Sequence, residues 1–163
     1  MAKMDQSKRD ALKKMLDDHE LKQQQQTRQR NERQTALEKF LAGYIEVTQS
    51  IIKPSFEEFS AELEKRGHPC TIDMDKPANP HDSLTAAKIT LTIFPNSATL
   101  THGNPSLSYA AAPNQRKIAA HRCTITSSGG ITASSVGEYT LEQLSREVVE
   151  QHLFDLAASI FSQ

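Results

Sequence analysis

The stretch from Leu37 to Gly67, LEKFLAGYIEVTQSIIKPSFEEFSAELEKRG, predicts one long amphipathic helix. Its apolar residues recur at a spacing close to one helical turn, so they form one stripe along the helix. The stripe consists of Leu37, Phe40, Leu41, Tyr44, Val47, Ile51, Ile52, Phe56, Phe59 and Leu63. Lys65, Arg66 and Gly67 are typical of a helix end, and Pro69 prevents continuation. Such a stripe must pack against a sheet, a second helix or a second copy of the chain.

Pro54 lies inside this helix, where a proline removes one backbone hydrogen bond and costs about 3 kcal/mol. The helix either kinks at this residue or ends near Lys53 and starts again. Ser55 and Glu58 fit a capping box that would support a new start. The apolar stripe crosses Pro54 without a change of phase, so we expect one helix that is kinked near Pro54.

After Pro69 the apolar residues alternate with polar ones, which is typical of strands with one buried face. The clearest strand is Lys88 to Phe94, in which Ile89, Leu91 and Ile93 share one face. Other strands are expected at 70–75, 106–111, 117–126 and 131–136, with a loop at 76–83, and 98–101 is a further candidate for a short strand. Because short turns join most of these strands, the sequence predicts an antiparallel meander of four to five strands, apolar on one face.

The last predicted element is a helix that begins near Thr140. Thr140 and Gln143 match a capping box, and Ser145 is an alternative cap one turn later. The apolar stripe of this helix includes Leu141, Leu144, Val148, His152, Leu153, Leu156 and Ile160. We expect an α+β fold in which this helix and the central helix pack together on one face of the sheet.

Residues 1–36 are predicted to be a polar extension, either helical or a disordered tail, beside a single α+β domain at 37–163. The extension contains one short apolar stripe, Leu12, Met15 and Leu16, before the glutamine-rich sequence QQQQTRQRNERQ. We favour a helix, because Gly43 is the only breaker between Lys8 and Glu46. A heptad extended backward from Phe40 meets Arg33, Gln26, His19 and Leu12, so a coiled coil would be polar in its middle.

The composition predicts a protein with free thiols and without a membrane span. Two cysteines are too few for a disulfide framework. No run approaches the roughly 18 apolar residues of a membrane span. The first residues, MAKMDQSKRDALKK, lack the apolar core of a secretory signal. We therefore expect a cytoplasmic location, free thiols and no membrane partner.

The net charge of −1 is unevenly distributed along the chain. Residues 83–137 contain no acidic residue and four basic ones, namely Lys88, Arg116, Lys117 and Arg122. On one sheet surface these cations could bind an anion or a nucleic acid. Nucleic acid is not favoured, because only Tyr109 and Phe94 could stack on bases there. The alternative is a Ser- and Thr-rich sheet that simply carries few charges.

The pairs His68-Pro-Cys70 and His121-Arg-Cys123 are the nearest approach to a metal site, since two His and two Cys complete a zinc set. Their spacing is shorter than in known zinc motifs, and a buried free Cys behaves as a small hydrophobe. The set is therefore a weak candidate, and we expect no metal and no cofactor. Motifs for nucleophiles, metalloproteases and phosphate loops are absent from the sequence.

Together these patterns favour a non-enzymatic, self-associating interaction module over an anion or nucleic-acid binder and, third, a small enzyme centred on His121 and Cys123. The element order, and no sequence motif, resembles that of small dimeric bacterial adaptor, chaperone and nucleoid-associated domains. A sheet spanning about 20 Å cannot cover a helix from Leu37 to Leu63. We therefore expect a homodimer, or another protein partner, held through the apolar residues before Pro54: Leu37, Phe40, Leu41, Tyr44 and Val47.

Overall fold

The computed structural model describes residues 4–75, 87–100, 103–126 and 128–162. The loop expected at 76–83 therefore lies outside the described residues. The chain divides into two compact units, Met1–Glu38 and Lys39–Gln163. The first unit is the N-terminal part of helix α1, which spans Gln6–Val47. No helix within the described part of the chain has both the length and the apolar character to cross a membrane.

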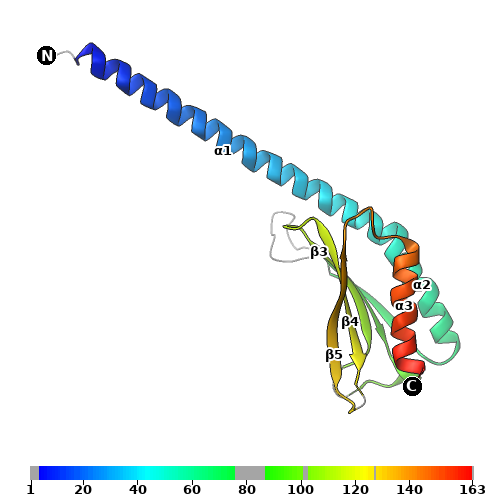
Figure 1. Cartoon of the computed structure of the whole chain (residues 1–163). Helices are drawn as coiled ribbons and strands as arrows, with labels where there is room; N and C mark the ends of the chain where they lie inside the picture. Colours follow the sequence, from blue (N-terminus) through cyan, green and yellow to red (C-terminus); the bar gives the residue numbers. More distant parts are fainter. Residues whose placement is uncertain (1–3, 76–86, 101–102, 127, 163) are drawn as a thin grey trace. The chain divides into compact units, whose positions relative to one another are not determined.

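The second unit contains a five-stranded antiparallel sheet (Figure 1). Its strands are β1 (Cys70–Asp75), β2 (Lys88–Ile93), β3 (Ser106–Ala112), β4 (Lys117–Ile125) and β5 (Ile131–Tyr139). They lie in the order β1-β2-β3-β4-β5, so each strand pairs with its neighbour in sequence. The predicted α+β meander is confirmed.

The helix continues through Pro54, as the unbroken apolar stripe predicted. A π-helical segment, η1 (Thr48–Ile52), connects α1 to α2 (Lys53–Lys65). Pro54 falls in the first turn of α2, directly after this wider turn. Prolines and π-helical turns are two of the few features that bend a helix. The Ser55 hydroxyl donates to the Ile51 carbonyl at 2.7 Å, so Ser55 does not cap a new helix.

Gly67 ends α2 in the way that the sequence predicts. Its φ of 86° lies in the left-handed region, where only glycine is free of strain. The Gly67 amide donates to the Glu64 carbonyl, and the His68 amide donates to the Leu63 carbonyl. These two bonds form a Schellman motif, which satisfies carbonyls that the helix end leaves free.

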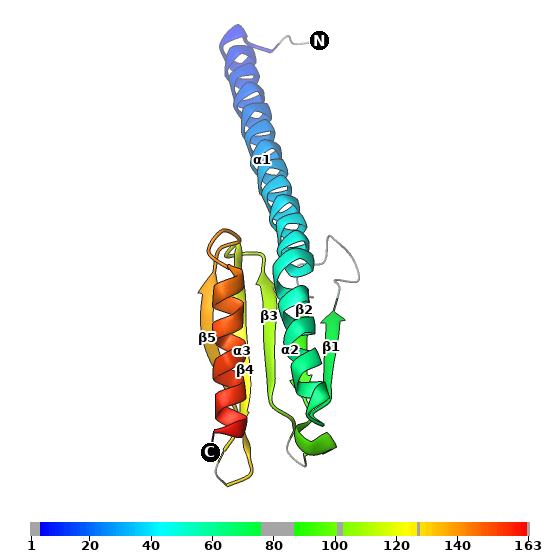
Figure 2. The ribbon, with the colours of Figure 1, turned by 90° about the vertical axis from the view of Figure 1, so that its right-hand side faces the viewer.

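The second unit has two layers, because α2 and α3 (Arg146–Phe161) lie side by side on one face of the sheet (Figure 2). The strand residues that face these helices are fully or nearly buried: Ile89, Leu91, Ile93, Leu107, Tyr109, Ala111, Ile118 and Ala120. Phe56 from α2 and Val149, Leu153 and Leu156 from α3 complete the core. The opposite, open face carries small residues such as Thr90, Ser106 and Ala119.

The segment 98–100 is not a strand, contrary to the sequence-based expectation for 98–101, whose last residue is not described. The side chain of Asn104 holds this segment in a loop. Its Nδ2 donates to the Ile93 and Ala98 carbonyls at 3.1 and 3.0 Å, and its Oδ1 accepts from the Leu100 amide at 3.3 Å. These bonds occupy the backbone groups that a strand would use.

Strand β5 and helix α3 differ from expectation at their ends. β5 continues to Tyr139, three residues beyond the predicted end, because a register shift beside Ala120 and His121 restores its pairing with β4. Thr140 and Gln143 form the expected reciprocal capping box. That box closes only a turn, and α3 begins at Arg146 with Ser145 as its N-cap.

Candidate protein-interaction surface

The four basic residues of segment 83–137 do not form one surface. Lys88 and Lys117 pair with Ala110 and Ala112, so both lie on the open face of the sheet. Arg116 lies in the turn before β4 with a φ of 53°. Arg122 pairs with buried Leu107 and therefore lies on the helix-covered face. The sheet itself separates Arg122 from Lys88 and Lys117.

The weak metal set is also divided by the sheet. Cys70 pairs with Ile93 on the covered face, whereas Cys123 pairs with Ser106 on the open face. Burial raises the pKa of the Cys70 thiol, which suits a structural cysteine. The His68 Nδ1 accepts a hydrogen bond from the Asn96 amide at 2.9 Å. Among the described residues, no group of three or more His, Cys, Asp or Glu could hold a metal ion.

The third hypothesis centred an enzyme on His121 and Cys123. Both residues lie on the open face of β4, opposite Ser108 and Ser106. His121 is exposed on this flat surface. His121 and Cys123 line neither the cavity beside Tyr44 and Met74 nor the groove between α2 and α3.

Two of the five residues expected to mediate self-association are core residues of their own domain. Phe40 and Tyr44 are only 5% and 3% exposed. The Tyr44 hydroxyl donates to the Tyr109 carbonyl at 2.9 Å, and burial raises the pKa of Tyr44 to about 12. Leu41 and Val47 pack against the same core, and Leu37 is half-buried. The expectation that the sheet layer could not cover this part of the helix is wrong for Phe40 and Tyr44.

A polar network links the sheet to α3 inside this core. His152 is 6% exposed, and both of its ring nitrogens are hydrogen-bonded. The Nδ1 atom lies 2.6 Å from the Tyr109 hydroxyl, and the Nε2 atom lies 3.0 Å from the Tyr139 hydroxyl. Burial lowers the pKa of His152. The charge of Asp155 opposes this shift, and the charge of Arg122 adds to it. His152 is thus a satisfied neutral histidine, not a candidate catalyst.

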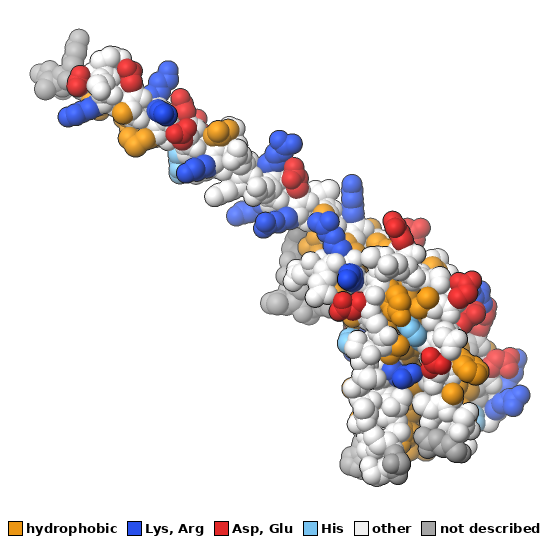
Figure 3. All heavy atoms as spheres, viewed as in Figure 1, with side chains coloured by type: hydrophobic (Ala, Val, Ile, Leu, Met, Phe, Trp, Pro, Cys, Tyr) orange, Lys and Arg blue, Asp and Glu red, His pale blue; other side chains and the backbone are white. Residues whose placement is uncertain are grey.

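An apolar groove lies between α2 and α3. It has a volume of about 330 Å³. Phe59 from α2 and Leu153, Phe154 and Ala157 from α3 supply its apolar side chains. Phe154 is 67% exposed, which is unusual for an aromatic residue on a helix whose other large apolar side chains are mostly covered. The helical side of the molecule in Figure 3 carries apolar side chains at its surface, with acidic side chains beside them.

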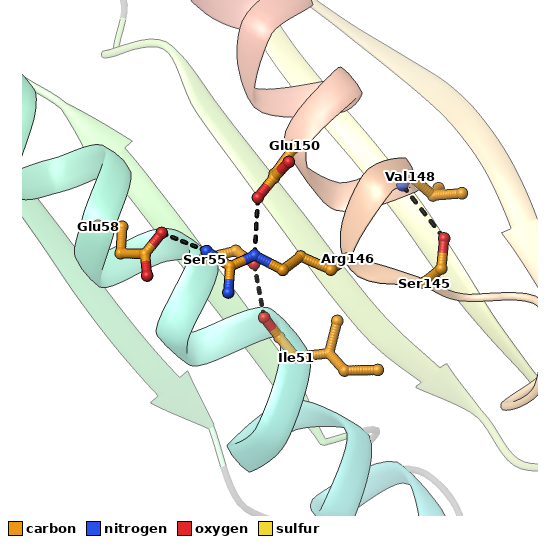
Figure 4. A network of polar contacts seen from close by, with 7 residues as sticks. All are labelled: Ile51, Ser55, Glu58, Ser145, Arg146, Val148 and Glu150. Atoms are coloured by element: carbon orange, nitrogen blue, oxygen red, sulfur yellow. Dashed lines mark hydrogen bonds and ion pairs between the residues drawn. The ribbon is translucent and has the colours of Figure 1, made fainter.

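The rim of the groove is acidic. Glu58 and Glu62 from α2 and Glu150 from α3 line it, next to Ser55. Arg146, in the first turn of α3, bridges two of these carboxylates (Figure 4). Its Nε lies 2.7 Å from Glu150, and its Nη2 is paired with Glu58 across the groove. Because these groups are solvent-exposed, the bridge fixes the positions of the carboxylates more than it stabilises the fold.

The helices around the groove carry an excess of negative charge. Together α2 and α3 contain seven acidic and three basic residues. Lys65 is paired with Glu62 at 3.1 Å, and Arg146 is occupied by Glu58 and Glu150. The groove therefore presents an apolar floor inside a rim of three carboxylates, whose negative charge Arg146 and Lys65 offset only in part.

The sequence analysis missed Phe154. Its position is one residue away from the predicted apolar stripe of α3, which runs through His152, Leu153 and Leu156. An aromatic side chain that falls off the stripe of an otherwise regular amphipathic helix is the signal that could have identified it.

Comparison with models of known protein families, with curated proteins and with solved structures found no match for this chain.

Proposed function

We propose that the protein is a non-enzymatic interaction module that associates with itself through its helices. The observation that carries this proposal is exposed apolar surface on α1. Leu12, Met15 and Leu16 are 41%, 62% and 53% exposed. Their spacing puts all three on one face of the helix. Exposed apolar side chains gathered on one face are typical of a protein-binding site, whereas single exposed ones are ordinary.

The burial of Phe40 and Tyr44 moves the proposed contact toward the N-terminus. These two side chains belong to the core of the second unit and have little area left for a partner. Leu12, Met15 and Leu16 belong to the first unit, which is too small to build a core of its own. A second chain is the simplest way to remove their apolar surface from water.

An anion or nucleic-acid binder is the weaker alternative. That hypothesis relied on a shared basic surface, and Arg122 lies on the opposite side of the sheet from Lys88 and Lys117. The open face that carries the two lysines also carries Asp73 and Asp75 on β1. A surface with both signs of charge gives little attraction for a polyanion.

The test is the oligomeric state of the full chain, measured by sedimentation at micromolar concentration. The variant Met15→Glu with Leu16→Glu should be a folded monomer, because it places two charges on the apolar stripe. Leu21→Glu is the matched control, since nine residues separate Leu21 from Leu12 and place it on the opposite side of the helix. It should associate like the wild type. A wild-type protein that is monomeric in this assay would overturn the proposal.

A further inference from the structure

We propose that the acidic groove between α2 and α3 binds the N-terminal stripe of a second copy of this chain. We define the N-terminal stripe as Leu12, Met15, Leu16 and His19. The inference rests on the proposed self-association and adds which two surfaces meet. It makes the contact reciprocal, with the stripe of each protomer in the groove of the other, which is the arrangement that closes as a two-fold dimer.

The N-terminal stripe has basic flanks. At 3.6 residues per turn, Lys8 and Arg9 fall on the same side of α1 as the stripe, with Lys13 and Lys22 along its margins. Only Asp5 and Glu20 bring negative charge to that side. The far side carries the acidic residues Asp10, Asp17 and Asp18 and one cation, Lys14. The apolar side of the helix therefore has an excess of positive charge, and the far side has an excess of negative charge.

The groove has the complementary pattern. Its floor is formed by exposed Phe154 with Phe59, Leu153 and Ala157, and its rim by Glu58, Glu62 and Glu150. Arg146 and Lys65 pair with these carboxylates, and three carboxylates against two cations leave the rim with an excess of negative charge. An apolar stripe with basic margins would place its leucine and methionine side chains against Phe154 and its lysines beside the glutamates. This is the helix-in-groove mode, in which apolar anchors give affinity and charges set orientation.

The same charges argue against a parallel coiled coil between two N-terminal stripes. In a parallel pair of identical helices, each residue lies near its own copy, so the cations around the stripe would meet cations. The heptad also runs through His19, Gln26 and Arg33 before it reaches Phe40. A groove with an acidic rim provides opposite charges where a second stripe provides like ones.

The experiment uses two full-length variants, each with one surface broken. Met15→Glu with Leu16→Glu breaks the stripe, and Phe154→Glu breaks the groove. Because Phe154 is 67% exposed, Phe154→Glu should keep the wild-type fold, which circular dichroism and thermal melting can verify. Phe161→Glu, at an exposed aromatic residue of α3 outside the groove, is the matched control and should associate like the wild type.

Each broken variant should be monomeric, with dimer dissociation constants raised at least tenfold. An equimolar mixture of the two should form a heterodimer, because it contains one intact stripe and one intact groove. Sedimentation with one variant labelled by a fluorophore measures this rescue. If Phe154→Glu remains a dimer while the stripe variant is a monomer, the groove is not the receptor and this inference is overturned, although self-association stands. If the wild type itself is monomeric, the proposed function fails first.

Discussion

The hydrogen bond between His152 and Tyr109 offers a sharp test of the core. Tyr109 is fully buried, and its hydroxyl lies 2.6 Å from Nδ1 of His152. A neutral imidazole has one donor and one acceptor nitrogen, so it can serve Tyr109 and Tyr139 together. In His152→Leu both tyrosine hydroxyls lose this partner. Tyr139 is only partly buried and can turn to water, whereas Tyr109 cannot.

The expected loss follows from the orphaned Tyr109 hydroxyl. Leaving a buried donor or acceptor without a partner costs about 1–3 kcal/mol, whereas replacing both partners by apolar groups is nearly neutral. His152→Leu should therefore lower the free energy of unfolding by about 1–3 kcal/mol at pH 7.5. The double variant His152→Leu with Tyr109→Phe should recover most of that loss, giving a double-mutant cycle with clear coupling.

The same residue predicts a pH dependence with a definite sign. Burial lowers the pKa of His152 in the folded state, and Arg122 adds to this effect while Asp155 opposes it. The unfolded chain then binds a proton near the ordinary histidine pKa of about 6.5, before the folded chain does. Stability is complete above that pH and falls as the pH drops from about 6.5 toward the lower folded pKa. The slope from one histidine cannot exceed about 1.4 kcal/mol per pH unit.

Urea unfolding at pH 7.5 and 5.5, followed by circular dichroism, measures both effects. The wild type should lose more stability between the two pH values than His152→Leu does, because the variant has no imidazole to charge. His121→Gln, at an exposed histidine on the open sheet face, controls for the removal of a histidine from the chain. The reasoning is refuted if His152→Leu loses as much stability on acidification as the wild type, or if Tyr109→Phe gives no recovery.

Three further predictions test the fold. Leu91→Asp should prevent folding, because Leu91 is fully buried at the centre of β2 and an unpaired buried charge is very costly; a soluble variant with a wild-type melting curve would contradict this. Ser145→Ala should cost about 1 kcal/mol in urea unfolding, because Ser145 caps α3; no loss would mean that the cap bond to Val148 is not formed. Treatment with EDTA should leave the melting temperature unchanged, and a clear drop would revive the His and Cys pairs as a metal site.

The predictable parts of this fold are those in which one local signal acts alone. The alternation of Ile89, Leu91 and Ile93 identified β2, because each side chain has only two faces available to it. Gly67 identified the end of α2, because the left-handed backbone conformation there is strained for any residue other than glycine. The capping residues Thr140 and Ser145 were both found. Which of the two caps α3 was not predicted, because the choice between two nearby caps depends on packing against the sheet.

The parts that sequence could not predict depend on tertiary contacts. Arg122 lies on the covered face because alternate residues of a strand share a face, and Ile118 and Ala120 are on that face of β4. Its charge had suggested a surface position. Its Nε is buried and has no hydrogen-bond partner among the described residues. Segment 98–100 forms a loop because of Asn104, a side chain several residues away. The extra length of β5 required a register shift beside Gly137, and the strand prediction ended at Val136 without using that glycine as a bulge signal.

The length argument placed the exposed apolar residues of the helix on the wrong segment for Phe40 and Tyr44, and self-association itself stays a prediction. A helix with surplus apolar residues must cover them, and the length argument placed the surplus between Leu37 and Val47. Phe40 and Tyr44 in that region are covered, because the Tyr44 hydroxyl reaches the Tyr109 backbone and Gly43, without a Cβ, lets Leu141 approach closely, whereas Ile45 is 56% exposed. The surplus is real at Leu12, Met15 and Leu16, where the first unit has no core. Exposed apolar side chains therefore lie on the segment that composition alone described as polar.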